Sequence, residues 1–122
     1  MNKDLTTKIE RLCTELTEMF DSEFPTLAGS RTHTFKKGRK FVKIIEADAE
    51  GNSRSVWGFI NLAHDKFEVG DILLAAGWAA PALNKARGNL LNGYLVSRRN
   101  LYGPGYIAGY CAGGKRVEGG LI

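Results

Sequence analysis

A run of cations interleaved with aromatic side chains is the feature of this sequence whose residue types could do chemistry. Residues 31–43 carry six basic side chains and no acidic one, and Phe35 and Phe41 lie among them. Proteins that follow a phosphate backbone combine such cations with rings on which bases stack. The sequence therefore predicts a surface that contacts nucleic acid. The alternative is that these lysines and arginines, on a loop and an edge strand, keep a sheet soluble and block edge pairing.

Further cations near the C-terminus could extend this surface. Arg87 precedes Gly88 and Asn89, and the three together offer a donor fork, a flexible glycine and an amide. The same three residues also suit a tight turn whose arginine pairs with an acidic residue of the segment 46–71. The predicted nucleic-acid-binding residues are Arg31, Phe35, Lys36, Lys37, Arg39, Lys40, Lys43, Arg87, Arg98 and Arg99. Among them Phe35 is the expected stacking ring.

Other reactive side chains form no recognisable site. His33, His64, Cys13 and Cys111 lack the paired spacing that structural zinc uses, so we expect no metal and no cofactor. His64 and Asp65 could form an acid-base couple, but adjacent residues seldom point together. No catalytic residue is predicted, and the glycine-rich segments match no phosphate loop.

An amphipathic helix is the first element that must position these residues. The spacing predicts a helix over residues 4–21, capped by Asn2 or Asp4 and ended by Phe24 before Pro25. Its apolar stripe consists of Leu5, Ile9, Leu12, Leu16 and Met19. Such a stripe covers the domain's own sheet or pairs with a second helix in a dimer.

An antiparallel hairpin is predicted next, with strands over 39–47 and 53–61 and turn residues at 50–52. Residues 27–33 before it are expected to form a loop. Alternation places Phe41 and Lys43 on one face of the first strand. In the second strand it places Trp57 and Phe59 on one face.

The short apolar run over residues 72–75 predicts a buried strand. Residues 82–96 are predicted to form a loop with a helical turn. Trp57 and Trp78 are both expected in the core. Tyr102 begins a glycine-rich stretch whose large side chains could form a final edge strand.

The predicted fold is α+β, with the N-terminal amphipathic helix packed on a small, mostly antiparallel β-sheet or partly open barrel. At 122 residues the chain fits a single domain. Its expected parts are the helix (1–24), a β-rich core (32–112) and a flexible glycine-rich tail (113–122).

Part of the chain resembles a known group of proteins. The segments FVKII, SRSVWGFIN, GDILLAAGWAAPALNKARGNLL and LYGPGYI are similar to those of small, largely uncharacterised proteins encoded by tailed bacteriophages. The resemblance covers residues 41–107 and implies a viral origin and a product that works inside an infected bacterium. It brings no established activity. The acidic N-terminal helix, residues 63–66 and the glycine-rich tail depart from the pattern.

Charge and composition leave a second function open. The net charge of +4 is divided into alternating acidic and basic blocks, which suit self-complementary surfaces. The alternative function is thus a protein-interaction module that acts on a host factor or self-assembles as a homo-oligomer, including a virion component. No run of about 18 apolar residues and no signal-peptide pattern occurs, so we expect no membrane partner and a cytoplasmic location. Both cysteines are expected to be reduced thiols.

Overall fold

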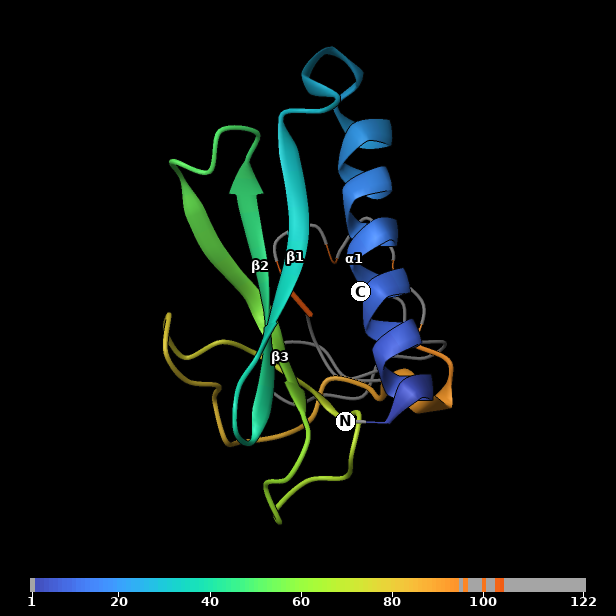
Figure 1. Cartoon of the computed structure of the whole chain (residues 1–122), viewed down its shortest axis with the longest axis vertical. Coiled ribbons are helices and arrows are strands. Elements are labelled where there is room, and N and C mark those ends of the chain that lie inside the picture. Colours follow the sequence, from blue (N-terminus) through green and yellow to red (C-terminus); the bar gives the residue numbers. More distant parts are fainter. Residues whose placement is uncertain (1, 95, 97–99, 101–102, 105–122) are drawn as a thin grey trace, which may run out of the picture.

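In the part of the chain that the structure describes, one α-helix packs on a four-stranded antiparallel sheet. The computed structural model describes residues 2–94, 96, 100, 103 and 104. The elements in chain order are α1 (Lys3–Glu23), η1 (Pro25–Leu27), β1 (Arg31–Lys37), β2 (Phe41–Asp48), β3 (Arg54–Asn61), β4 (Ile72–Leu73) and η2 (Leu90–Asn92). The strands lie in the order β1-β2-β3-β4, and α1 runs beside β1 along one face (Figure 1). The predicted α+β class is confirmed, with an open sheet.

The helix predicted over residues 4–21 covers Lys3–Glu23, and it has one of the two predicted caps and the predicted end. The Asn2 side-chain oxygen accepts the Leu5 N–H at 2.7 Å, which satisfies one of the free donors of the first turn. Phe24 is the C-cap, and Pro25 starts the short helix η1. Phe20 continues the buried stripe in place of the predicted Met19.

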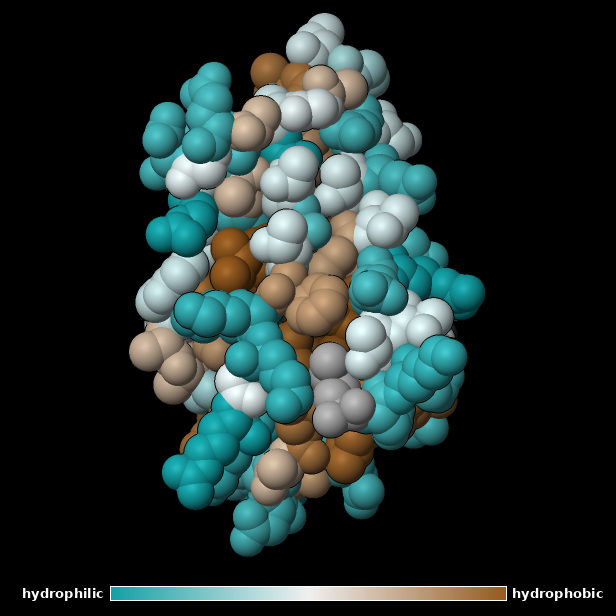
Figure 2. All heavy atoms as spheres, viewed as in Figure 1, coloured by the Kyte–Doolittle hydropathy of each residue, from teal (hydrophilic) through white to brown (hydrophobic). Residues whose placement is uncertain are grey.

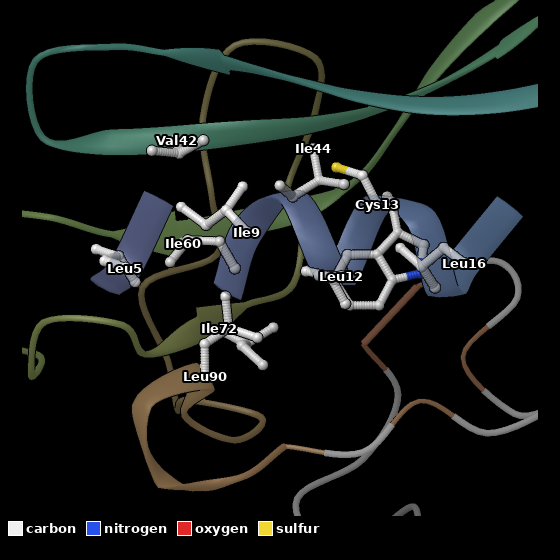
Figure 3. Packing of buried hydrophobic residues seen from close by; sticks show 11 residues of the cluster. Leu5, Ile9, Leu12, Cys13, Leu16, Val42, Ile44, Ile60, Ile72 and Leu90 are labelled. Atoms are coloured by element: carbon white, nitrogen blue, oxygen red, sulfur yellow. The ribbon is translucent and has the colours of Figure 1, made fainter. Parts of the chain in front are cut away.

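The core lies between α1 and the sheet (Figure 3). Side chains of the helix meet side chains of the strands there, and Leu90 of η2 packs against both. The labelled members of this cluster are Leu5, Ile9, Leu12, Cys13, Leu16, Val42, Ile44, Ile60, Ile72 and Leu90. Burial of such side chains contributes roughly 1.5–3 kcal/mol each, so this layer fixes the position of the sheet.

The strand β1 corrects the predicted loop over residues 27–33. Arg31 to Lys37 pair with β2 in a continuous antiparallel register. The first predicted strand begins at Phe41, two residues later than expected, because the segment 38–40 forms the turn between β1 and β2. The Gly38 N–H donates to the Phe41 carbonyl oxygen at 2.8 Å and closes this turn.

A β-bulge changes the faces of β3. The register with β2 shifts between Ile44 and Ile45, so that Ile44 pairs with Gly58 and Ile45 with Val56. The extra residue, Trp57, belongs to the helix-facing cluster, whereas Phe59 meets Phe41 on the opposite face. The prediction that Trp57 and Phe59 share a face is therefore wrong, because a bulge interrupts strict alternation.

Among the described residues after β3, one short strand and one 3-10 helix are the regular elements. β4 and η2 confirm the predicted buried strand and the loop with a helical turn. The Trp57 indole N–H donates to the Asn100 carbonyl oxygen at 2.5 Å, and the Asn100 side-chain amide donates to the Pro104 carbonyl oxygen at 3.0 Å. These bonds attach Asn100 and Pro104 to the sheet. The predicted strand from Tyr102 and the tail lie outside the described residues, apart from positions 103 and 104.

Candidate functional site

The turn between β1 and β2 is held by main-chain hydrogen bonds on two sides. Gly38 and Phe41 close it, as described above. The Lys40 carbonyl oxygen also accepts the N–H groups of Leu62 and Ala63, at 2.8 and 3.1 Å. The backbone of the turn is thus fixed to the chain beyond β3, while its charged side chains are exposed.

A hollow of about 430 Å³ lies at this turn, on the face of the sheet opposite α1. Its lining residues are Lys36, Lys37, Gly38, Arg39, Lys40, Phe41, Lys43, Phe59 and Ala79. We call it the basic hollow, because five of these residues are cationic and none of the described lining residues is acidic. On the face drawn in Figure 2, hydrophilic residues lie at the lower left, where Figure 1 shows the turn between β1 and β2.

Like charges face each other within the lining of the basic hollow. Lys36 of β1 is the direct cross-strand partner of Lys43 of β2. Like charges directly opposite each other in an antiparallel pair are unfavourable. A bound anion would relieve this repulsion, so the arrangement favours a negatively charged ligand.

Aromatic side chains form the apolar part of the hollow and continue beyond it. The Phe41 ring lies 6.2 Å from that of Phe59 and 5.8 Å from the stacked ring of His64, which in turn lies 5.8 Å from Phe67. The buried Asn61 amide donates to three carbonyl oxygens of the loop 64–68 and accepts the His64 N–H. This single side chain therefore holds the loop that places His64 against Phe41.

Trp78 stands beside the basic hollow and is 47% exposed. Its loop is closed by a bridge between Ala75 and Pro81, and the neighbouring Ala79 lines the hollow. The Lys43 ammonium lies 4.2 Å from the indole centroid, and the Arg54 guanidinium carbon 5.5 Å from it. Each cation–π contact at an exposed site is worth about 0.5–1 kcal/mol, so the two contacts position the ring. The prediction of two core tryptophans is correct for Trp57 and wrong for Trp78.

The structure brings half of the predicted site residues together and separates others. The five that line the basic hollow are Lys36, Lys37, Arg39, Lys40 and Lys43. Phe35 pairs with Ile44 and packs against the helix-facing core, so it does not lie among these cations. Arg31, at the other end of β1, lines a separate hollow with Glu46 and Asp48. Arg98 and Arg99 lie outside the described residues.

Arg87 is part of the sheet's opposite edge. Its backbone N–H donates to the Ile72 carbonyl oxygen at 2.6 Å, and the Ile72 N–H donates to the Gly88 carbonyl oxygen at 2.8 Å. The Asn89 side chain accepts the Leu91 N–H and donates to the Asp71 carboxylate. These bonds support the structural interpretation of the Arg-Gly-Asn segment. Arg87 is not among the residues that line the basic hollow.

Sequence reasoning missed Trp78, Arg54 and the Phe59 ring as members of the site. Phe59 could have been found from its pairing opposite Lys43, had the bulge been recognised. Trp78 reaches the sheet through the fold of a loop. The small residues around it, Ala-Gly-Trp-Ala-Ala, are a local sign that its neighbours in sequence leave the ring exposed.

A buried polar cluster joins α1 to the sheet away from this site. The Thr17 hydroxyl accepts the His33 backbone N–H and contacts the His33 ring Nδ1, both at 3.0 Å. Nε2 of the same ring lies 3.5 Å from a Glu46 carboxylate oxygen. The His33 contact, opposed by burial and aided by the charge of Arg31, holds the pKa of Glu46 below its ordinary value. The imidazole side chain is fully covered, so this cluster serves to join two elements.

Other reactive groups of the described part of the chain form no site. Burial, with a smaller contribution from Glu10, raises the pKa of the Cys13 thiol to about 12, which makes it a core side chain. Within residues 2–94, 96, 100, 103 and 104, no group of three His, Cys, Asp or Glu side chains could hold a metal ion. In the same residues, no helix has the length and apolar character needed to cross a bilayer.

The fold and site define a small α+β domain with an open antiparallel sheet and a basic, aromatic hollow on the face opposite α1. The chain belongs to DUF7717, a family of unknown function whose model matches residues 1–109. No curated protein and no solved structure matches the chain.

Proposed function

We propose that this protein is a small phage-encoded nucleic-acid-binding protein that holds phosphate groups in the basic hollow. One observation supports the proposal above all. Five cations from β1, β2 and their turn surround a hollow with aromatic rings in its lining, and no described residue of that lining is acidic.

The chemistry of the hollow matches a nucleic-acid strand. Lysine and arginine side chains neutralise successive phosphates and release the counterions bound to them. Aromatic rings within the same surface contact bases or sugars, which a simple inorganic anion lacks. The turn carries its cations on a fixed backbone, so binding does not have to order this part of the chain.

The viral part of the proposal rests on the resemblance of residues 41–107 to proteins of tailed bacteriophages. It implies that the protein works in the cytoplasm of an infected bacterium. Comparing its abundance in host cells before and after infection tests this part independently of binding.

Fluorescence anisotropy with labelled oligonucleotides, at low and at physiological salt, tests the binding. If all five cations contact phosphates of a single strand, the logarithm of the binding constant should fall with the logarithm of salt with a slope of about −3.5, since each contact contributes about 0.7. Replacing Lys36 and Lys40 with glutamine should weaken binding and reduce the slope by about 1.4.

The matched control replaces Lys3 and Arg11 with glutamine. Both side chains are exposed on α1, so this variant loses the same charge away from the hollow. It should bind nearly as the wild type does. Equal losses in the two variants, or no binding by the wild type at low salt, would overturn the proposal and direct the search to protein partners.

A further inference from the structure

The geometry points to single-stranded nucleic acid as the ligand of the basic hollow, with one base stacked on the Trp78 indole. This inference rests on the function proposed above and specifies it. Cations alone do not distinguish a single strand from a duplex, since both expose phosphates. The aromatic side chain at the margin of the hollow does.

Trp78 is exposed because its neighbours cannot cover it. Residues 75–77, 79 and 80 are alanine or glycine, and the loop is held by the Ala76 N–H bonded to the Ala80 carbonyl oxygen at 3.1 Å. Among the described residues, Trp78 is one of four large hydrophobic side chains that are exposed. An indole presented on a loop closed by its own hydrogen bonds forms a platform for a flat, apolar ligand group.

Two side chains of the sheet support this platform. Lys43 and Arg54, which contact the indole, belong to β2 and β3 and extend from the sheet toward the loop. They act as positioning residues that fix the orientation of the ring. The remaining part of the indole is accessible. Ala79, the next residue in the chain, lines the same hollow as the cations of the β1–β2 turn, so the ring lies close to these cations.

A base can reach this ring only where it is unpaired and unstacked. In a duplex each base is stacked between its neighbours, so its face is not available to a protein side chain. A duplex would gain from the cations alone, whereas a single strand would gain from both the cations and Trp78. We therefore expect tighter binding to single strands at equal salt.

The chain contains its own reporter for this contact. It has two tryptophans, and Trp57 is 2% exposed, with its N–H bonded to Asn100. A base that stacks on a tryptophan in the folded protein must therefore stack on Trp78. Quenching of the intrinsic fluorescence by a ligand measures that event.

The experiment titrates the whole protein with three polyanions: a thymidine oligonucleotide of about 12 nucleotides, its duplex with the complementary strand, and inorganic polyphosphate. We expect the single strand to quench the fluorescence and to bind most tightly. Trp78→Ala should weaken single-strand binding about tenfold and leave polyphosphate binding unchanged, while Trp78→Phe, which keeps a ring, should lose less. Thermal unfolding of each variant confirms that the fold is intact.

The outcomes separate this inference from the proposed function. If Trp78→Ala binds the single strand as the wild type does, or if the duplex binds and quenches equally well, the stacking inference is wrong. Loss of binding in the Lys36 and Lys40 variant would in that case still uphold the basic hollow. Binding of polyphosphate with the same affinity as the single strand, and no quenching, would mean that bases are not recognised.

Discussion

The absent side chain of Gly58 allows β3, β4 and the C-terminal segment to pack together. A Cβ atom built at this position would lie 2.9 Å from the Leu73 carbonyl oxygen and 2.9 Å from Pro104 Cγ. The first is backbone of the paired strand β4, and the second belongs to a rigid ring. Neither can move away by a rotamer change, so Gly58→Ala should displace β4 or Pro104.

The loss of stability in Gly58→Ala follows from the kind of clash that the added carbon makes. Adding one carbon to a well-packed site typically costs 1–3 kcal/mol, and the two contacts below 3.0 Å favour a value of about 2 kcal/mol. For a domain of this size, about 1 kcal/mol corresponds to roughly 4 °C in the unfolding midpoint, so Gly58→Ala should lower Tm by about 8 °C.

Thermal unfolding followed by circular dichroism measures the shift. Gly77→Ala is the matched control, because a Cβ atom there has nothing within 4 Å and the residue does not require a positive φ. Its Tm should equal or slightly exceed that of the wild type, since alanine restricts the unfolded chain more than glycine does. A Tm of Gly58→Ala within about 2 °C of the control would refute the reasoning.

Three further predictions concern the buried groups. Thr17→Val removes the acceptor of the His33 N–H and should lower the free energy of unfolding by about 1–3 kcal/mol in urea titrations; an unchanged midpoint would contradict it. Glu46 has a lowered pKa, so its stabilising contribution is present above its ordinary pKa of 4.5 and is lost as the pH falls through the folded value. The wild type should lose more stability in acid than Glu46→Gln, and parallel curves would argue against this. The Cys13 thiol, with its raised pKa, should resist iodoacetamide at pH 8 until urea unfolds the protein, as peptide mass spectrometry can measure; rapid labelling of the native protein would oppose it.

The elements set by local pattern were predictable from the sequence. The helix follows from its apolar spacing and from Pro25, and the β2–β3 hairpin from two β-branched runs around a turn. The strand β1 was not predicted. One reason is that its inward positions, the buried His33 and the half-buried Phe35, give only one step of alternation. So short a signal is hard to separate from a loop.

The kinds of side chain in the site were predictable from the sequence, but which residues come together there was not. Cations on both sides of a hairpin turn must come together, and those of Lys36 to Lys43 do. Arg31 lies five residues before Lys36 on the same strand, which separates the two by about 17 Å at 3.3 Å per residue. Phe35 points to the opposite face by alternation. Trp78 depends on a loop that returns to the sheet, and no local spacing encodes such a contact.

The double hydrogen bond to the Lys40 carbonyl oxygen has a consequence for the spacing of charges. Leu62 and Ala63 hold the turn in one conformation, so the loss of backbone entropy, roughly 1–2 kcal/mol per residue, is already included in folding. The distances between the Cα atoms of the turn's cations are then a constant of the fold. The turn therefore favours a ligand whose negative charges have a regular spacing that matches its own cations over a ligand whose charges are irregularly spaced.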